Sequence, residues 1–329
     1  MNPAQQNKSY DGIYMLKALC AFFVVIYHVD FLYNNELKPI THIAVHVFYI
    51  ISGFFLYTGY AKSEISKAKK WLKKIILWTI ALNILYFIFV KKFETDISLF
   101  NIIYILFQGG VISTPLWYMT ALWEALLVFI VIRCMLPEKM VQFLIMTAPA
   151  AFLISLATST YNCYIFNNSF KSLWLAMSFI SVAIPCLSLG YLIGKYKEKI
   201  NQFHHWGILT CSCIILAYIE FYTIGNTSTP VYFLTTLPLS ACIFIFAINF
   251  NHSCRLASTI GKRDSANIYY FHMLIAHFFC YESWVNFAPA AAKMYGLVIY
   301  ILCIIFSMIY HYFYSIIQSL LGLKKRIPS

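Results

Sequence analysis

Charge is scarce in this sequence. Only 11% of its 329 residues are charged, whereas a soluble domain carries about 25%. Acidic residues are few, 12 against 24 lysines and arginines, while 61% of the residues are hydrophobic and the mean hydropathy is +0.72. No polar stretch is long enough to form a sizeable soluble domain. These absences exclude a soluble protein and predict an all-α, polytopic integral membrane protein with one domain over residues 1–329.

Signals for three other classes are also missing. The leader Met1–Tyr10 is polar and no small-residue cleavage site follows the first apolar segment, so no cleaved signal peptide is expected. The ten cysteines are scattered, and the close pair Cys211 and Cys213 has no histidine in register. We therefore expect apolar fillers and no metal site. The net charge of +12 is the excess of cytoplasmic cations usual in membrane proteins, so no nucleic-acid partner is expected.

Apolar segments recur along the whole chain and predict ten transmembrane helices. An eleventh segment, 97–113, contains Asn101, Gln108 and a Gly-Gly break, and we expect it to be re-entrant or to lie at the outer surface. With both termini in the cytoplasm, only five cations other than the intramembrane Lys17 fall in outer loops, which satisfies the positive-inside rule. The expected spans are 13–33, 41–61, 72–90, 115–136, 141–159, 172–194, 206–224, 230–249, 267–287 and 294–321.

Two ionisable residues, Lys17 and His28, lie within the first expected span. Their separation of eleven residues is about three helical turns, or ~16 Å, and places both on one face of the helix. A charge inside hydrocarbon is unfavourable by roughly 2.5–3.5 kcal/mol on insertion scales, so such residues usually face a polar interior and are functional. The alternative is that Lys17 reaches the interface and His28 bonds a neighbouring helix.

The expected ninth span also carries histidines, His272 and the deeper His277. Two helices with intramembrane imidazoles, bordered by cytoplasmic cations, predict a site that handles protons and an anionic ligand entering from the cytoplasm. For Glu124 and Asp30, a role in the site and a structural role both stay open. Glu220 is expected to be an interhelical hydrogen-bond partner or an interfacial residue.

Five motifs follow one another in a fixed order along the chain: Tyr10–Ile13 with Val24–His28, Phe48–Leu56, Trp71–Ile76, Leu116–Met119, and Ile260–Arg263 with Ile268–His272. In this order they resemble the acyltransferase-3 family of integral-membrane acyltransferases. Lys17 and His28 match its Arg/Lys-x10-His signature, although Arg is commoner at the first position. The segment 264–266 loosens the family's usual Lys-x-Ser spacing.

The resemblance implies transfer of an acyl group, often acetyl, from cytoplasmic acyl-CoA to a hydroxyl of a carbohydrate or lipid-linked glycan. Acyl-CoA is then a donor co-substrate, and no permanently bound cofactor is expected. Cytoplasmic cations would hold the phosphates of CoA, and a pantetheine arm would carry the thioester about three helical turns inward. The candidate cations are Lys17, Lys73, Lys74, Lys262 and Arg263.

We hypothesise that His28 is the general base for the acceptor hydroxyl or a transient acyl carrier. His272 would bind the diphosphate or the thioester carbonyl, with a packed, hydrogen-bonded role as the alternative. Trp117 and Tyr118 would line the tunnel or stack on adenine or sugar, although aromatic residues are common at membrane interfaces. Ser52-Gly53 is expected to permit close approach of two helices.

Two alternatives without acyl transfer stay open: a polysaccharide or lipid-linked sugar exporter or flippase, with the histidines as a proton relay, and an assembly subunit of an export complex. Inverted repeats and paired broken helices, which favour a transporter, are not evident in the sequence. A multi-pass protein of a bacterial inner membrane is expected, with acyl-CoA, a glycan acceptor and the lipid bilayer as partners. A homodimer is left open.

Overall fold

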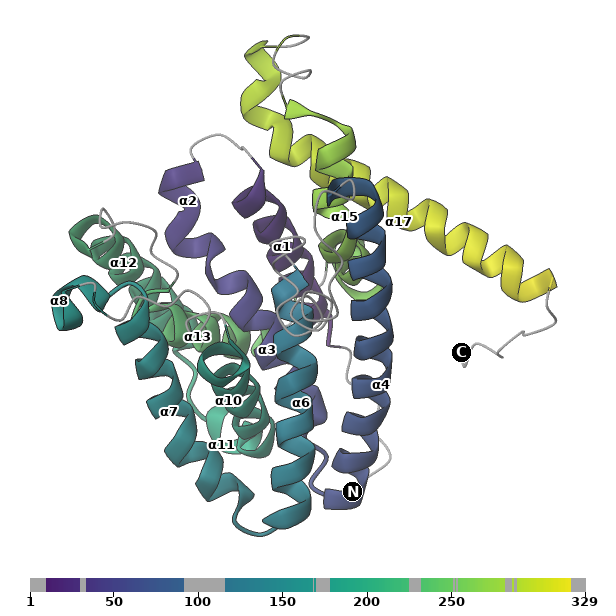
Figure 1. Cartoon of the computed structure of the whole chain (residues 1–329). Coiled ribbons are helices and arrows are strands. Elements are labelled where there is room, and N and C mark those ends of the chain that lie inside the picture. The colour runs from purple at the N-terminus through teal and green to yellow at the C-terminus, as the bar shows by residue number, and fades with distance from the viewer. Residues whose placement is uncertain are drawn as a thin grey trace.

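The computed structural model describes residues 10–29, 34–91, 116–167, 169, 178–224, 232–250, 252, 254–281, 286 and 289–320. Within these residues every regular element is a helix and no strand occurs (Figure 1). The predicted all-α class is thereby confirmed. The segment 97–113, expected to be re-entrant or superficial, and Asp30 lie outside the described residues.

The chain order of the helices follows the apolar segments of the sequence. Three short π-helical stretches, η2, η4 and η5, and one 3-10 helix, η6, extend or precede α-helices. The elements are α1 (Asp11–His28), α2 (Asn34–Thr41), α3 (Ile43–Leu56), α4 (Ala61–Tyr86), η2 (Phe87–Lys91), α6 (Trp117–Met135), α7 (Met140–Thr158), α8 (Asn162–Phe166), η4 (Phe179–Ala183), α10 (Ile184–Lys195), α11 (Lys197–Ile200), α12 (Trp206–Ile224), α13 (Thr236–Asn249), α14 (Arg255–Thr259), η5 (Ile260–Asp264), α15 (Ser265–Phe278), η6 (Pro289–Met294) and α17 (Tyr295–Leu320).

Seven described helical stretches are long and apolar enough to cross a bilayer, so the chain is a multi-pass membrane protein. The other three predicted spans coincide with shorter helices: Phe179–Lys195, Thr236–Asn249 and the 14-residue α15. A total of ten spans and cytoplasmic termini therefore stay predictions. The seven stretches are Asp11–His28, Glu36–Leu56, Ala61–Phe89, Trp117–Met135, Met140–Thr158, Trp206–Ile224 and Ala292–Ser319.

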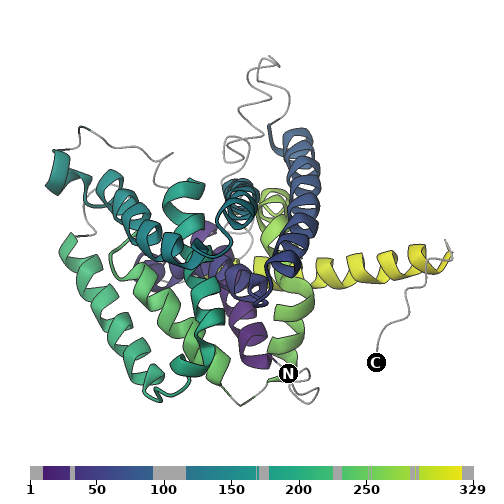
Figure 2. The same cartoon turned by 90° about the horizontal axis from the view of Figure 1, so that it is seen from below.

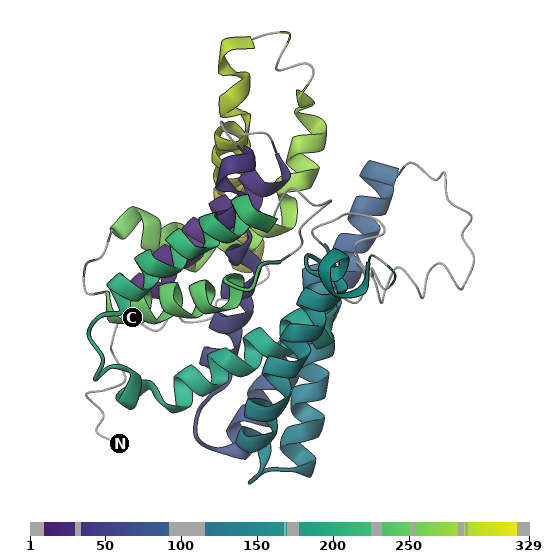
Figure 3. The same cartoon turned by 90° about the vertical axis from the view of Figure 1, so that its left-hand side faces the viewer.

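The helices form a bundle with α1 and α3 at its centre. Figure 3 shows α4, α6 and α7 (blue to teal) on one side and α12 and α13 (green) on the other. The second half of α17 extends away from the other helices (Figures 1 and 2). The central pair is antiparallel: Tyr10, before α1, meets Phe54 near the end of α3 at 6.0 Å between ring centroids, and Tyr27 meets His42, just before α3, at 5.0 Å.

Glycine brings α3 and α10 into backbone contact. A Cβ atom placed on Gly53 would lie 1.9 Å from the carbonyl oxygen of Leu187, and one placed on Gly190 would lie 1.9 Å from that of Ile50. Because real Cβ atoms essentially never approach a neighbour this closely, each position requires glycine. The close helix approach predicted for Ser52-Gly53 is confirmed, and α10 is the partner helix.

A buried carboxylate holds α4, α6 and α10 together at one end of the bundle. Glu64 is fully buried and accepts hydrogen bonds from the Thr58 and Gly59 amides at 3.1 and 3.0 Å. It also accepts from Arg133 Nε at 2.8 Å and from the Tyr191 hydroxyl at 3.0 Å. Four donors satisfy the charge, which is the condition for burying an ion pair.

Replacing Glu64 with alanine should therefore destabilise the protein strongly, because Arg133, whose side chain is 11% exposed, would lose its counter-charge. Breaking a buried pair by removing one partner is unfavourable by about 3–5 kcal/mol. Thermal unfolding in detergent measures the loss, and Glu198→Ala, at an exposed site, is the control. Equal melting temperatures of the two variants would contradict the anchoring role of Glu64.

Candidate functional site

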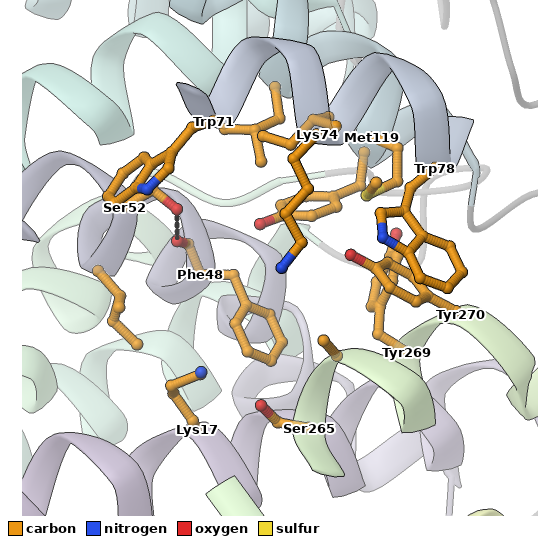
Figure 4. A pocket seen from close by; sticks show the side chains of 15 residues that line it. Lys17, Phe48, Ser52, Trp71, Lys74, Trp78, Met119, Ser265, Tyr269 and Tyr270 are labelled. Carbon is orange, nitrogen blue, oxygen red and sulfur yellow. Dashed lines mark hydrogen bonds between the residues drawn. The ribbon is translucent and has the colours of Figure 1, made fainter. Parts of the chain in front are cut away.

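A cavity of about 250 Å³ opens between α1, α3, α4, α6 and α15 (Figure 4). Its wall is mainly aromatic and aliphatic, with two lysines and two serines as polar exceptions. Ser52 donates a hydrogen bond back to the carbonyl of Phe48 at 2.9 Å, so its hydroxyl is already engaged. Apolar walls with a few convergent polar groups are typical of ligand sites.

Lys17 of α1 and Lys74 of α4 give the cavity a positive charge. Their amino groups point toward the same space (Figure 4), and they are close enough to repel each other. None of the described residues that line the cavity is acidic. Two uncompensated cations in largely apolar surroundings favour an anionic ligand, which would relieve the repulsion.

A pair of histidines lies beyond the cavity, where α1 and α15 run side by side. The rings of His28 and His272 are 5.4 Å apart and inclined by 32°. The first turns of α1 touch η5, which continues into α15, since a Cβ on Gly261 would lie 1.7 Å from the carbonyl oxygen of Tyr14. Neither histidine lines the cavity. On α1, Lys17 thus faces the cavity while His28 faces the second histidine.

The hydrogen bond of His272 fixes its tautomer. Its Nδ1 lies 2.8 Å from the carbonyl oxygen of Tyr269, and because a carbonyl only accepts, Nδ1 must carry the proton. Nε2 is then an unprotonated acceptor, and this buried atom has no hydrogen-bond partner among the described residues. A buried imidazole with an open lone pair can accept a proton or hold a hydroxyl group.

The other candidate residues are placed differently. Lys73 and Lys74 are both exposed, but only Lys74 lines the cavity. Lys262 is exposed, with its amino group 5.7 Å from the centre of the Tyr14 ring. Tyr118 lines the cavity, whereas Trp117 does not. The structure therefore brings Lys17, Lys74 and Tyr118 together.

Arg263 is occupied by a carboxylate that the sequence did not single out as a partner. Its Nε and Nη2 donate to Asp264 at 2.9 Å each, and Asp264 is fully buried. The same carboxylate accepts from the hydroxyl of Ser307 at 2.7 Å, and Ser307 in turn accepts from Asn267 at 2.9 Å. This network ties the start of α15 to α17 and leaves Arg263 fewer free donors for a ligand.

A second group of histidines, on and just before α3, was missed from the sequence. His46 is buried, its Nδ1 lies 3.2 Å from the carbonyl oxygen of His42, and its ring lies 4.6 Å from that of Tyr232. Tyr27 meets the rings of both His28 and His42 at 5.0 Å. The spacing of four residues between His42 and His46, which places both on one helix face, was the available signal.

Glu220 has the structural role predicted for it. Its carboxylate accepts from the Leu234 and Thr235 amides at 2.6 and 2.9 Å and from the Tyr161 hydroxyl. Burial and this carboxylate raise the pKa of Tyr161. The role of Glu124, in α6, stays open. Among the described residues no group of histidines, cysteines and carboxylates is arranged to hold a metal ion.

Comparison with known proteins agrees with the motif order. The model of the acyltransferase-3 family, described as an acyltransferase domain, matches residues 10–320, nearly the whole chain. No curated protein and no solved structure matches the chain. The matched range contains the cavity, the histidine pair and every motif on which the resemblance was based.

Proposed function

The chain belongs to the acyltransferase-3 family, and on this premise we propose that it transfers an acyl group, acetyl in the first instance, from cytoplasmic acyl-CoA to a hydroxyl of a cell-surface or lipid-linked glycan. Acyl transfer, of a group other than aminoacyl, follows from the family itself. One observation supports the finer proposal: a cavity with two cations is lined by Tyr269, one helical turn of α15 before the buried His272, whose ring meets that of the half-buried His28.

The cavity suits the pantetheine end of the donor. Its volume of about 250 Å³ is below the roughly 300–1,000 Å³ of sites that enclose a drug-sized ligand, so only part of CoA would enter. Lys17 and Lys74 would then hold phosphate oxygens at the mouth. The nucleotide would remain outside, within reach of the exposed Lys73 and Lys262.

The histidines would carry the proton chemistry. In a direct transfer, an imidazole nitrogen takes the proton of the acceptor hydroxyl while the oxygen attacks the thioester carbonyl. The carbon–sulfur bond then breaks, and the imidazolium returns its proton to the leaving thiolate. In the covalent alternative, a nitrogen of His28 attacks the thioester carbonyl, and the carbon–sulfur bond breaks to release CoA as its thiolate. The acceptor hydroxyl then attacks acyl-His28, the carbon–nitrogen bond breaks to free the imidazole, and the hydroxyl proton passes to the thiolate. His272, held by Tyr269 through Nδ1, offers Nε2 for orienting the hydroxyl or for receiving its proton.

Cytoplasmic acyl-CoA requires the cavity to open toward the cytoplasm. The lysines on the first turns of α4 lie at the same end of the bundle as Glu64, and the positive-inside rule places this end in the cytoplasm. The opposite ends of α1 and α15, with His28, would then lie nearer the outer side. We propose a bacterial inner membrane as the location.

Purified wild-type protein should release thiol from acetyl-CoA when cell-envelope glycan is supplied as acceptor. Replacing Lys17 with alanine should raise KM for acetyl-CoA roughly ten- to hundredfold with a smaller effect on kcat, because a hydrogen bond to a charged group contributes about 1.5–3 kcal/mol. Lys17→Arg should restore part of the affinity.

The matched control is Lys199→Ala, at an exposed cation outside the cavity, which should keep the wild-type KM. An unchanged KM in Lys17→Ala would remove Lys17 from the donor site. Failure of the wild type to bind or consume any acyl-CoA would overturn the transferase proposal.

A further inference from the structure

Three aromatic rings from three different helices meet in the wall of the cavity. Phe48 of α3, Tyr118 of α6 and Tyr269 of α15 all line it, and each is at most 9% exposed. Phe48 lies 6.3 Å from each of the two tyrosine rings, and the tyrosine rings lie 4.9 Å apart, as ring centroids. All three pairs are thus within the range of direct ring contact. We call these residues the aromatic triad.

The aromatic triad connects the cavity to the histidine pair through Tyr269. Tyr269 is the member next to the histidines, since its ring lies 6.0 Å from that of His272 and its carbonyl accepts the Nδ1 proton. The cavity is lined by all three rings but by neither histidine. An acyl group that enters beside Lys17 and Lys74 and moves along α15 toward His272 would therefore pass these rings.

We propose, on the basis of the function proposed above, that the aromatic triad is a steric filter for acyl chain length, which admits acetyl thioesters and discriminates against propionyl, butyryl and longer ones. Buried rings in mutual contact leave little free volume, because protein interiors are packed as densely as organic crystals. Each added methylene must displace a ring or stop the thioester carbon short of the histidines. The filter thus restricts the acyl-CoA donors of the reaction to short-chain thioesters.

Phe48 is the member of the aromatic triad whose replacement changes the free volume and removes no polar side-chain atom. Tyr118 and Tyr269 each carry a phenol hydroxyl, and the ring of Tyr269 lies 6.0 Å from that of His272. The Phe48 side chain has no polar atom. Shortening it should open the filter and leave the tautomer of His272 unchanged.

The test compares acetyl-, propionyl-, butyryl- and hexanoyl-CoA as donors for full-length wild type, Phe48→Ala and Phe48→Leu. Thiol release with cell-envelope glycan as acceptor gives kcat/KM for each donor. A methylene in a hydrophobic pocket changes this ratio by about 10–200-fold, so wild type should prefer acetyl over butyryl by at least about tenfold. Phe48→Ala should reduce that preference by a similar factor, with Phe48→Leu between the two.

Trp78→Ala is the matched control. Trp78 lines the same cavity but stacks on Tyr270, at 5.3 Å and 23°, and is not a member of the aromatic triad. Its loss should change KM for all donors together and leave the acetyl-to-butyryl ratio as in wild type. Because Phe48→Ala leaves a cavity that destabilises the fold, the smaller change to leucine keeps the test decisive if the alanine variant does not fold.

The possible outcomes distinguish failure of the filter proposal from failure of the proposed acyltransferase function. An acetyl-selective wild type whose selectivity falls in the Phe48 variants and persists in Trp78→Ala supports the filter. Turnover of acetyl-CoA with the same chain-length profile in wild type and both Phe48 variants overturns the filter and leaves the acyltransferase intact. Equal use of all four donors by wild type also overturns the filter. Absence of any acyl-CoA consumption by wild type overturns the proposed function.

Discussion

Alanine at position 28 should reduce acetyl-CoA turnover by about 10²–10⁴-fold, the range contributed by a positioned general acid or base. His28 lies at the end of α1, and its ring is 5.4 Å from that of the buried His272. Because His28 does not line the cavity, CoA should bind to His28→Ala as tightly as to wild type. Thiol release measures turnover, and calorimetric titration with CoA measures binding.

His277→Ala is the matched control, since His277 lies exposed near the end of the same helix as His272. It should retain near wild-type turnover. Two results would remove His28 from the reaction: turnover within about tenfold of wild type in His28→Ala, or a loss of CoA binding equal to the loss of turnover. Trapping of acetyl on wild-type protein incubated without acceptor would select the covalent route, and its absence would select direct base catalysis.

Alanine at position 53 should prevent the native packing of α3 against α10. The added methyl group would lie 1.9 Å from the carbonyl oxygen of Leu187 and 2.8 Å from its carbonyl carbon. Both are backbone atoms within a helix, so relief requires the two helices to separate. Overpacking of a dense interior is unfavourable by about 1–3 kcal/mol and occasionally more. We expect the cost of Gly53→Ala to lie at the upper end of this range.

The expected result is a large fall in the thermal midpoint of Gly53→Ala in detergent, together with loss of turnover because Phe48 and Ser52 lie on the same helix and line the cavity. A thiol-reactive dye reports unfolding, since Cys20, Cys186 and Cys303 are buried. Gly207→Ala is the control: its methyl group would meet a Phe246 ring carbon at 3.4 Å, an ordinary contact, and alanine favours helix over glycine by about 1 kcal/mol. Equal midpoints for the two variants would contradict the close-packing requirement at Gly53.

Much of the fold could be predicted from local sequence. Long apolar segments predict membrane helices because a chain in lipid must satisfy its backbone polar groups internally. The short helices Phe179–Lys195 and Thr236–Asn249 were recognisable for the same reason. Gly53 could be recognised as a contact point, since only small residues allow helices to approach within a membrane, but its partner on α10 could not.

The candidate site shows the limit of local patterns. Lys73 and Lys74 are equally good cations in sequence, yet only Lys74 lines the cavity, because consecutive residues point about 100° apart on a helix and packing selects the face. Arg263 is also an apparent phosphate ligand, but the buried Asp264 occupies it. Whether Arg263 is free to bind a ligand depends on the burial of Asp264, which also accepts a hydrogen bond from Ser307 of α17.

The sequence by itself determined the helical membrane class, the family, and the shared face of Lys17 and His28, because composition, motif order and helical period are properties of the local chain. Only the tertiary structure decided that His28 meets His272, that Lys17 and Lys74 face one cavity, and that the rings of the aromatic triad meet in its wall. Each of these contacts joins helices far apart in the chain. Which faces meet is set by the close packing of all the helices together, and no single segment encodes it.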